Sequence, residues 1–275
     1  MTLKAAVVGW PISHSLSPKI FSAFARSAQM PLQYAALEIE PGEFAGALRK
    51  ACADGWVGWN VTLPHKLAAR ALSDRLDKSA REAGAVNVIR FQDGKRIGYN
   101  TDADGFLAPL KKRGFVSRGK RAVVLGAGGA ARAVCAALRR EKVADLRILN
   151  RTPEKARELA LAFGGDAAQW TREELLIAIG RADLVVNATS LGLEGEGSPI
   201  HGGAKFKPGA LAYDLIYNPR ETPFLLAAKT SGAQTLGGLG MLVAQAAATW
   251  KIWFKKDLPI AAVENAEAAL QEILE

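Results

Sequence analysis

Cysteine and histidine are scarce in this sequence of 275 residues. The two cysteines, Cys52 and Cys135, lie far apart in alanine-rich segments, so we interpret them as buried free thiols rather than as a disulfide or metal ligands. The three histidines, His14, His65 and His201, show none of the paired spacings that zinc sites use. The sequence therefore predicts no metal site and no disulfide framework.

Long apolar runs are also absent, although 49% of the residues are hydrophobic. The apolar stretches are short and are broken by glycine or by charge, whereas a helix that spans a bilayer needs about 20 apolar residues. The first residues have the pattern of a strand rather than that of a secretory signal. We therefore expect a soluble cytoplasmic protein, long enough for two domains of about 100 to 200 residues each.

Acidic residues are fewer than basic ones, and the formal net charge is +9. A positive potential raises the local concentration of phosphates and carboxylates, so anionic small molecules suit this chain as ligands. The basic residues are scattered, and the sequence contains no helix-turn-helix, zinc-finger or aromatic RNA-binding signature. Nucleic acid is therefore a weak alternative partner, and a solvated basic surface accounts for most of the charge.

Strand and helix patterns alternate along the first hundred residues. Residues 3–8 form a short apolar strand, and Ser17 and Pro18 are the residue types of a helix N-cap and first helical position. The further expected elements are a helix to about residue 28, a strand at 33–39, a helix from Pro41 to 53, a strand at 56–61 and a helix from Pro64. Between strand-like runs at 87–91 and 96–99, Asp93-Gly94 is a favoured hairpin turn. We expect a parallel sheet with an antiparallel edge.

A second alternating series follows a helix expected at 102–113. Its strands are expected at 121–125, 146–149, 184–187, 210–216 and 234–236, with helical stretches such as 153–162 between them, and helices at 241–254 and 259–274 close the chain. Such alternation is typical of a doubly wound, Rossmann-like α/β fold. We therefore expect two α/β domains, and periodicity alone does not assign the two final helices to either of them.

A glycine-rich loop joins the strand at 121–125 to an alanine-rich helix. The loop reads Gly126-Ala127-Gly128-Gly129-Ala130-Ala131, which is the GxGxxA spacing. In this spacing the first glycine permits a tight turn, the second lets the backbone approach a pyrophosphate, and the helix N-terminus offers free N–H groups. Out of context such glycines are more often an ordinary loop, but their place between a strand and a helix predicts dinucleotide binding.

The end of the next strand indicates which dinucleotide binds. An NAD site usually has Asp or Glu there for the ribose 2′-hydroxyl, but this sequence has Asn150, Arg151 and Thr152. The guanidinium of Arg151 can bind a 2′-phosphate through paired hydrogen bonds, and Thr152 can add a hydroxyl donor. NADP is therefore favoured over NAD. The alternative is that Arg151 is an ordinary surface residue and Thr152 only caps the next helix.

Polar residues stand at strand and loop ends of the first domain, where a core does not need them. They are Ser15, Ser17, Asn60, Thr62, Lys66, Asn87, Thr101 and Asp102. Taken singly, each has a simple interpretation as a cap, a turn residue or a solvated side chain.

Together with their neighbours, these residues form motifs that resemble those of the shikimate dehydrogenase family. The motifs are SHSLSP at 13–18, NVTLPHK at 60–66, GAVN at 84–87, YNTD at 99–102, GAGGAA at 126–131, NRT at 150–152, NATSLG at 187–192, DLIYNP at 214–219 and GLGMLVAQA at 238–246. Because they occur in the family's order along nearly the whole chain, the resemblance is far more specific than the glycine loop alone.

The resemblance implies a substrate-binding catalytic domain at 1–102, completed by helices at 240–275, and an NADP-binding Rossmann domain at 103–239, with a cleft between them. It implies that Lys66 and Asp102 are the catalytic pair. The substrate contacts that it implies are Ser15 and Ser17 to the carboxylate, together with Asn60, Thr62, Lys66, Asn87, Asp102, Tyr217 and Gln245. The implied cofactor contacts are Gly126, Ala127, Gly128, Gly129, Ala130, Asn150, Arg151, Thr152 and Lys155, with Thr189, Gly238 and Met241 near the nicotinamide.

Lys155 is a departure from the family, which often has a second arginine there. Lysine keeps the positive charge but loses the planar fork of the guanidinium. We expect the NADP preference to rest on Arg151, and its strength stays open.

The implied reaction is the reversible reduction of 3-dehydroshikimate to shikimate with NADPH, a step of aromatic amino acid biosynthesis. The nicotinamide carries the hydride, so the protein must supply alignment and one proton. Lys66 suits the proton role, and Asp102 would orient it. The carboxylate favours the ammonium form of Lys66 while desolvation favours the neutral amine, and the sequence leaves both open.

Two other functions stay open. A quinate or quinate/shikimate dehydrogenase of the same superfamily would act on an acid with an additional ring hydroxyl and would more often use NAD. A non-catalytic NADP-binding sensor would keep the fold without needing a proton-transfer pair. Ser15, Ser17 and Arg151 favour shikimate and NADP, and the presence of both Lys66 and Asp102 favours an enzyme. The sequence fits a monomer and a homodimer equally.

Overall fold

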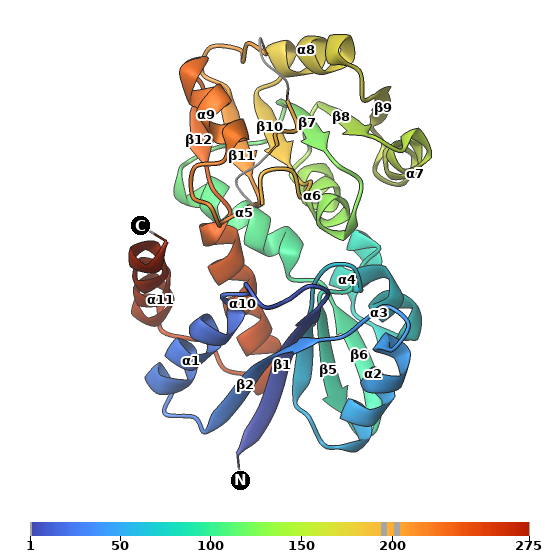
Figure 1. Ribbon diagram of the computed structural model, residues 1–275, viewed down its shortest axis with the longest axis vertical. Helices are drawn as coiled ribbons and strands as arrows, with labels where there is room; N and C mark the ends of the chain where they lie inside the picture. The colour runs from blue at the N-terminus through green and yellow to red at the C-terminus, as the bar shows by residue number, and fades with distance from the viewer. Residues whose placement is uncertain (1, 194–196, 201–203, 275) are drawn as a thin grey trace. The chain divides into compact units, whose positions relative to one another are not determined.

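The computed structural model describes residues 2–193, 197–200 and 204–274 of the chain. These residues form two compact units (Figure 1). The first unit contains the chain up to Gly105 together with Leu242–Ile273, and the second contains Phe106–Met241. No helix within these described ranges has both the length and the apolar composition needed to cross a membrane.

A six-stranded sheet with the order β2-β1-β3-β5-β6-β4 forms the centre of the first unit. Its strands are β1 (Leu3–Gly9), β2 (Leu32–Glu38), β3 (Gly58–Val61), β4 (Arg75–Leu76), β5 (Val88–Gln92) and β6 (Lys95–Tyr99). Strand β1 pairs in parallel with β2 and β3, whereas β5 is antiparallel to β3 and to β6. The expected mixture of parallel and antiparallel strands is confirmed, but the edge is not antiparallel: β5 lies inside the sheet between β3 and β6, and the edge strand β4 pairs in parallel with β6.

The hairpin between β5 and β6 has the two-residue turn that the sequence predicts. Gln92 pairs with Lys95, and the turn residues Asp93 and Gly94 have φ angles of 52° and 70°. Positive φ at both positions is the geometry of a type I′ turn, whose twist matches that of the strands. The hairpin directs the chain from β6 towards Asp102.

The helices of the first unit begin at positions that differ slightly from the expected ones. They are α1 (Ser17–Ser27), α2 (Phe44–Ala53), α3 (Lys66–Leu72) and α4 (Lys78–Ala83), and α11 (Ile260–Ile273) ends the described chain. Leu16 rather than Ser17 is the N-cap of α1. Pro41 and Pro64 lie in turns that precede α2 and α3. Because proline fixes φ at a value that suits both a turn and a first helical residue, the sequence does not distinguish these positions.

The chain leaves the first unit within α5 (Asp102–Lys112) and returns to it within α10 (Leu239–Phe254). In the first unit, Phe44 and Leu48 of α2 belong to one apolar cluster with Trp59 of the sheet. Trp253 of α10 donates a hydrogen bond to the carbonyl oxygen of Ile89 at 3.2 Å. Helices therefore pack on this sheet from segments at both ends of the sequence (Figure 1).

The second unit contains a fully parallel sheet with the order β12-β11-β10-β7-β8-β9. Its strands are β7 (Arg121–Leu125), β8 (Asp145–Asn150), β9 (Asp166–Gln169), β10 (Leu184–Asn187), β11 (Leu211–Asp214) and β12 (Gln234–Leu236), and its helices are α6 (Gly129–Arg140), α7 (Pro153–Phe163), α8 (Arg172–Arg181) and α9 (Pro223–Thr230). The sequence predicts a doubly wound fold with five of these strands, whereas β9 was not predicted. The strand order reverses between β7 and β10, where such folds bind ligands at the carboxyl ends of the strands.

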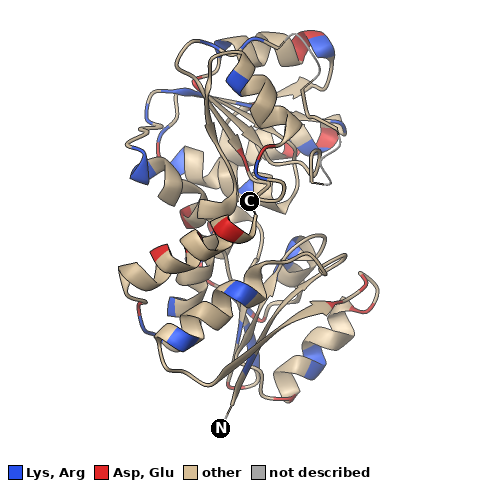
Figure 2. Ribbon diagram, turned by 60° about the vertical axis from the view of Figure 1, so that its left-hand side comes forward, with Lys and Arg blue, Asp and Glu red and all other residues tan. Residues whose placement is uncertain are grey.

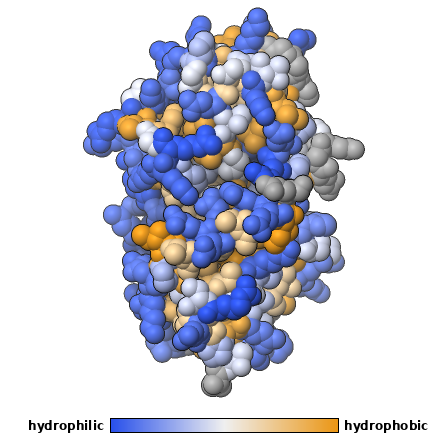
Figure 3. Space-filling view, turned by 90° about the vertical axis from the view of Figure 1, so that its left-hand side faces the viewer, coloured by the Kyte–Doolittle hydropathy of each residue, from blue (hydrophilic) through white to orange (hydrophobic). Residues whose placement is uncertain are grey.

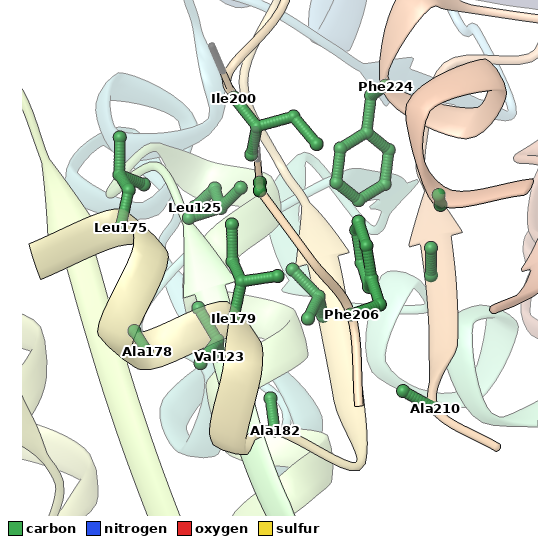
Figure 4. Packing of buried hydrophobic residues seen from close by; sticks show 14 of the residues in the cluster. Val123, Leu125, Leu175, Ala178, Ile179, Ala182, Ile200, Phe206, Ala210 and Phe224 are labelled. Atoms are coloured by element: carbon green, nitrogen blue, oxygen red, sulfur yellow. The ribbon is translucent and has the colours of Figure 1, made fainter. Parts of the chain in front are cut away.

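Buried side chains hold the central strand β7 in place. Figure 4 shows Leu175 and Ile179 of α8 directed towards Leu125 of β7, with Phe206 and Phe224 beside them. The two phenylalanine rings pack edge to face with 6.1 Å between their centroids. Close packing of this kind restricts the movement of the strand. The position at which the loop after Leu125 begins is therefore fixed.

The surface composition does not by itself mark a binding site. Lys and Arg are spread over helices and loops of both units (Figure 2). On the face drawn in Figure 3, apolar side chains form small groups between hydrophilic ones, which is normal for a protein surface. The candidate site is therefore identified from the polar groups at the ends of strands and helices, not from the surface composition.

Candidate active site

Lys66 and Asp102 both belong to the first unit and meet at the N-termini of two helices. Lys66 is the first residue of α3, and Asp102 is the first residue of α5. Lys66 Nζ donates a hydrogen bond to Asp102 Oδ2 at 2.5 Å, and the two side chains are only 13% and 7% exposed. The structure thus brings together the two residues that the sequence predicts as a catalytic pair, in a place from which water is largely excluded.

Asn87 holds the other carboxylate oxygen of Asp102. Its Nδ2 atom donates to Asp102 Oδ1 at 2.8 Å and to Thr101 Oγ1 at 3.0 Å, while its Oδ1 accepts from the backbone N–H of Thr101 at 2.8 Å. The backbone N–H of Asn87 in turn donates to the carbonyl oxygen of Tyr99 at 3.1 Å. Asn87 is 3% exposed, so the orientation of its amide is determined by buried hydrogen bonds on both sides.

Asn100 fixes the start of helix α5. Its Oδ1 accepts hydrogen bonds from the backbone N–H of Asp102 at 3.0 Å and of Ala103 at 3.4 Å, and its Nδ2 donates to the carbonyl oxygen of Ala85 at 3.1 Å. An asparagine that accepts from the first N–H groups of a helix satisfies donors that have no partner within the helix. The backbone of Asp102 is therefore positioned as firmly as its carboxylate.

Asn60 lies at the opposite end of the same network, on strand β3. Its Oδ1 accepts a hydrogen bond from the hydroxyl of Tyr34 at 2.8 Å, and its Nδ2 donates to Thr249 Oγ1 at 3.1 Å. Burial raises the pKa of Tyr34 well above its usual value, against a smaller lowering by a hydrogen bond with Ser17. Tyr34 therefore keeps its proton and acts as the donor that orients the Asn60 amide.

Thr249 of α10 links Asn60 to the Asn87 side of the site. Its hydroxyl donates to the carbonyl oxygen of Gln245 at 2.9 Å and lies 3.4 Å from Thr101 Oγ1. The Gln245 side chain donates from Nε2 to the carbonyl oxygen of Leu242 at 2.7 Å. The side chains of three predicted substrate residues, Asn60, Asn87 and Asp102, are thus connected within the first unit, and Gln245 joins them through its backbone carbonyl.

The other predicted substrate residues lie in three further segments of the chain. Ser15 Oγ accepts a hydrogen bond from the backbone N–H of Ser17 at 3.3 Å, and Ser17 is 5% exposed. Thr62 follows β3, and its backbone N–H donates to the carbonyl oxygen of Val8 in β1 at 2.9 Å. Tyr217 belongs to the second unit, on the segment between β11 and α9.

The glycine loop after β7 has the shape that a pyrophosphate requires. Gly126 has a φ of 109°, and a Cβ atom there would lie 2.9 Å from the carbonyl oxygen of Ala188. A Cβ atom at Gly128 would instead meet nothing within 4 Å, so open space lies beside the N-terminus of α6. Ala131 is fully buried, which lets α6 pack closely on the sheet. These residues fit a dinucleotide phosphate at a helix N-terminus.

The end of β8 carries the residues predicted to select the 2′-phosphate. Asn150 Nδ2 donates to the carbonyl oxygen of Thr152 at 2.9 Å, which makes a tight turn at the strand end. Thr152 is the N-cap of α7 but makes no side-chain capping hydrogen bond. Arg151, Thr152 and Lys155 are all exposed. The interpretation of Thr152 as only a cap is therefore weakened, since its hydroxyl is not used for that purpose.

Thr189, Gly238 and Met241 lie in the other half of the second unit. The Thr189 hydroxyl donates to Asn187 Oδ1 at 2.7 Å, and the backbone N–H of Gly238 donates to the carbonyl oxygen of Ile216 at 3.0 Å. Met241 is 8% exposed and lies in the first turn of α10. The predicted cofactor residues thus follow strands β7 and β8 and also β10 and β12, on both sides of the point where the strand order reverses.

His65 has a structural place beside the site. Its ring stacks on Phe44 with 4.5 Å between centroids, and its Nε2 lies 2.7 Å from the carbonyl oxygen of Ile39. Burial lowers the pKa of His65, against a smaller raising by the Ile39 carbonyl. Within the described ranges, no group of three or more His, Cys, Asp or Glu residues is placed to hold a metal ion, and His201 lies outside those ranges.

Sequence reasoning missed three residues that organise the site, namely Tyr34, Asn100 and Thr249. For Asn100 a signal exists, because asparagine two residues before a helical aspartate is a typical capping residue. Tyr34 and Thr249 have no local signal, since a tyrosine in a strand and a threonine in an apolar helix are ordinary core residues. Their roles depend on contacts between segments that are distant in the sequence.

Three family models match consecutive parts of the chain. Residues 7–89 match the shikimate dehydrogenase substrate binding domain, residues 110–193 match shikimate/quinate 5-dehydrogenase, and residues 238–266 match the shikimate 5′-dehydrogenase C-terminal domain.

Individual proteins are similar over almost the whole chain. The shikimate dehydrogenase (NADP(+)) of Moorella thermoacetica is 42% identical over 274 residues, which cover 94% of this chain and 90% of that protein. The structure of shikimate 5-dehydrogenase from Thermus thermophilus in complex with NADP(H) and shikimate has a TM-score of 0.88 at 37% identity and covers 98% of this chain and 99% of its own. Ligand-free 5-ketofructose reductase of a Gluconobacter species has a TM-score of 0.83 at 33% identity, with coverage of 98% and 99%.

Proposed function

The chain belongs to the shikimate dehydrogenase family, and on that basis we propose that it reduces 3-dehydroshikimate to shikimate with NADPH, with Lys66 as the proton carrier and Asp102 as its orienting partner. It is accordingly an oxidoreductase that acts on a CH–OH group and uses NADP. The observation that supports the residue assignment best is the buried contact of 2.5 Å between Lys66 Nζ and Asp102 Oδ2. The reaction is a step of aromatic amino acid biosynthesis.

The chain's own part in the chemistry is proton transfer and alignment. NADPH supplies the hydride when it is bound. Lys66 as an ammonium group donates a hydrogen bond to the substrate carbonyl oxygen and then gives that oxygen its proton as negative charge develops. In the reverse direction the neutral amine accepts the proton. Asp102 holds the amine in place, and Asn87 prevents the carboxylate from rotating because it occupies the other oxygen.

The polar groups around this pair suit a polyhydroxylated carboxylic acid. We assign the ring hydroxyls to the amide and hydroxyl groups of Asn60, Thr62, Asn87 and Gln245, in addition to Asp102, and the carboxylate to Ser15 and Ser17. Tyr217, which belongs to the second unit, is assigned to the substrate from the family resemblance alone. Asn60 and Asn87 are 6% and 3% exposed, and hydrogen bonds within the protein orient both amides, so a substrate hydroxyl meets them in a fixed geometry.

We assign NADP to the second unit. The loop Gly126 to Ala130 and the N-terminus of α6 receive the pyrophosphate, and Asn150, Arg151 and Thr152 receive the adenosine 2′-phosphate. The exposed Arg151 guanidinium can form two hydrogen bonds to a phosphate. Lys155 adds charge without that fork. Thr189, Gly238 and Met241 are assigned to the nicotinamide half.

These roles divide the chain into a substrate-binding catalytic domain at 1–102, completed by 240–275, and an NADP domain at 103–239. We further propose that the protein works in the cytoplasm, as a monomer or a homodimer, on small molecules and without a nucleic acid or membrane partner. Sedimentation of the purified chain at several concentrations distinguishes the monomer from the dimer.

The function is tested by measuring turnover of shikimate and of quinate, each with NADP and with NAD, at the absorbance band of the reduced cofactor. Reduction of 5-ketofructose with NADPH is a fifth arm, because a similar structure has that name. We expect shikimate with NADP to give the highest kcat/KM. Substantial quinate oxidation with NAD would support the quinate/shikimate alternative instead. Binding of NADP and shikimate without any reduction would support the sensor.

A further inference from the structure

A carboxylate is completely buried at the end of strand β11, and the roles assigned above do not use it. Asp214 has 0% exposure. Its Oδ1 accepts from Asn187 Nδ2 and from the backbone N–H of Ile216, both at 3.0 Å, and its Oδ2 accepts from Thr222 Oγ1 at 2.6 Å. Burial raises the pKa of Asp214, and these three hydrogen bonds oppose that shift. A buried carboxylate costs free energy that packing alone does not recover, so its presence calls for a role.

The partners of Asp214 each organise a different segment. Asn187 ends β10, and its Oδ1 accepts from both the backbone N–H and the hydroxyl of Thr189, at 3.0 and 2.7 Å. Thr222 caps helix α9 by accepting from the backbone N–H of Leu225 at 3.2 Å. A single carboxylate thus connects the segment after β10 with the N-terminus of α9.

The third partner extends the network to the segment before α10. Ile216, whose N–H donates to Asp214, accepts in turn from the N–H of Gly238 through its carbonyl oxygen. A Cβ atom at Gly238 would collide with the carbonyl of Leu215. The segments at 187–191, 215–217 and 238 are therefore held in one fixed arrangement around Asp214.

The position of these segments in the sheet indicates what they receive. The glycine loop follows β7, and the predicted 2′-phosphate residues follow its neighbour β8, so the adenosine half of a dinucleotide lies on that side. The remaining half extends across β10 and β11, where Asn187 and Asp214 end their strands. Contact continues across the reversal point, because a Cβ at Gly126 would lie 3.1 Å from Thr189 Cγ2.

We propose that Asp214 is a positioning residue that shapes the nicotinamide half of the cofactor site through Asn187, Ile216 and Thr222. It does not touch the cofactor itself. This inference rests on the proposed use of NADP. It adds that Asp214 fixes the positions of Thr189 and Gly238 relative to each other.

The substitution Asp214→Asn tests the proposal, because it keeps the side-chain shape but removes the negative charge to which Asn187, Ile216 and Thr222 donate. Dissociation constants are measured by calorimetry for NADPH and for adenosine 2′,5′-bisphosphate, which contains only the adenosine half. We expect the constant for NADPH to rise about 10-fold or more, as for the loss of a hydrogen bond to a charged group. The constant for adenosine 2′,5′-bisphosphate should stay within about 2-fold of the wild-type value, since the hydrogen bonds of Asp214 lead to Asn187, Ile216 and Thr222 rather than to β7 or β8.

Asp183→Asn is the matched control. Asp183 directly precedes β10, at the opposite end of the strand from Asn187, and it pairs with Lys207. This variant should bind both ligands as the wild type does. If Asp214→Asn binds NADPH as the wild type does, or weakens both ligands equally, the proposal is overturned.

A second variant covers the case in which Asp214→Asn does not fold. Thr222→Val keeps the carboxylate and the side-chain shape but removes one donor, and Thr222→Ser keeps that donor. Selective loss of NADPH affinity in Thr222→Val, restored in Thr222→Ser, supports the proposal, and unchanged affinity in Thr222→Val contradicts it. If the wild-type protein does not bind NADPH, the proposed function is contradicted, and this inference, which depends on it, is contradicted as well. That result is distinguishable because it precedes any comparison with a variant.

Discussion

At the scale of single residues, Asp102 is held by three neighbouring residues of the candidate site. Lys66 and Asn87 occupy one carboxylate oxygen each, and Asn100 holds its backbone N–H. Three independent contacts leave the carboxylate one orientation, and that orientation defines where the amine of Lys66 lies. Such preorganisation is what a proton carrier needs, because a positioned group avoids reorganisation during the reaction.

Replacing Lys66 should therefore affect the chemical step more than binding. We expect Lys66→Ala to lower kcat by about 10²- to 10⁴-fold, the usual contribution of a positioned proton-transfer group. Ser15→Ala provides the contrast and should mainly raise KM, since it removes one hydrogen bond to the substrate carboxylate, worth roughly 1.5–3 kcal/mol. Steady-state kinetics at saturating substrate measure both effects. More than half of the wild-type kcat in Lys66→Ala would show that another group carries the proton.

The sequence predicts the central residues of the candidate site better than the residues that hold them in place. Lys66, Asn87 and Asp102 stand in recognisable motifs, and the structure connects them by hydrogen bonds. Thr249 could not be predicted, because its hydroxyl acts on Asn60, 189 positions away. A hydroxyl within an apolar helix carries no sign of which distant segment will fold against it.

At the scale of secondary-structure elements, the sequence predicts those with a strong local pattern and misses short ones without such a pattern. The Asp93-Gly94 turn predicts its hairpin correctly because only a few residue types tolerate positive φ at two successive positions. Strand β4 and helix α4 were not predicted, since they have only two and six residues and no hydrophobic period. A local cap holds α4 and pairing with β6 holds β4. Asp77 caps α4 by accepting from the backbone N–H of Ser79 at 2.9 Å.

A further contact joins the turn before β4 to strand β6. Asp74 accepts from Arg96 Nε at 2.9 Å, from Arg96 Nη2 at 2.6 Å and from the Arg96 backbone N–H at 2.7 Å. The side-chain hydrogen bond from Arg96 is the main reason that the pKa of Asp74 is lowered to about 2. A lowered pKa means that the ionised carboxylate stabilises the fold fully above its unfolded pKa of about 3.9, and that this stabilisation is lost as the pH falls towards 2.

Asp74→Asn should lower the free energy of unfolding at pH 7 by about 0.5–1 kcal/mol, because the pair is partly exposed and solvent screens it. The difference from the wild type should shrink between pH 4 and pH 2. Urea denaturation of both proteins at pH 7, 4 and 3 measures it. Asp54→Asn, which breaks the exposed pair with Lys50, is the control and should change little. A difference for Asp74→Asn that does not vary with pH would assign the effect to something other than the ionised carboxylate.

At the scale of the whole molecule, the two sheets differ in how far the sequence predicts them. The doubly wound pattern of the second sheet follows from regular alternation, because right-handed crossovers leave few arrangements of a parallel sheet, although its short edge strand β9 was not predicted. The first sheet contains an antiparallel strand inside it, and nothing local specifies on which side of β6 the short strand β4 will pair. Prediction therefore succeeds where the chain repeats one connection and fails where connections of different kinds are mixed.

The two compact units should respond to different ligands. We expect shikimate alone to slow amide hydrogen exchange in the first unit, at 60–66, 85–88 and 99–105, and adenosine 2′,5′-bisphosphate alone to slow it in the second unit, at 126–132 and 149–153. A ligand at roughly 100 times its dissociation constant stabilises the form it binds by about 2.7 kcal/mol, which protects amides that exchange through opening of that unit. Exchange followed by mass spectrometry of peptides measures both patterns.

Adenosine 5′-monophosphate at the same concentration is the control for the second unit. Because it lacks the 2′-phosphate that Arg151 is proposed to bind, it should protect 149–153 less than the bisphosphate does. If shikimate alone slowed exchange at 126–132 and 149–153 as much as in the first unit, the assignment of substrate binding to the first unit alone would be wrong. Equal protection by both adenosine nucleotides would remove the basis for assigning the NADP preference to Arg151.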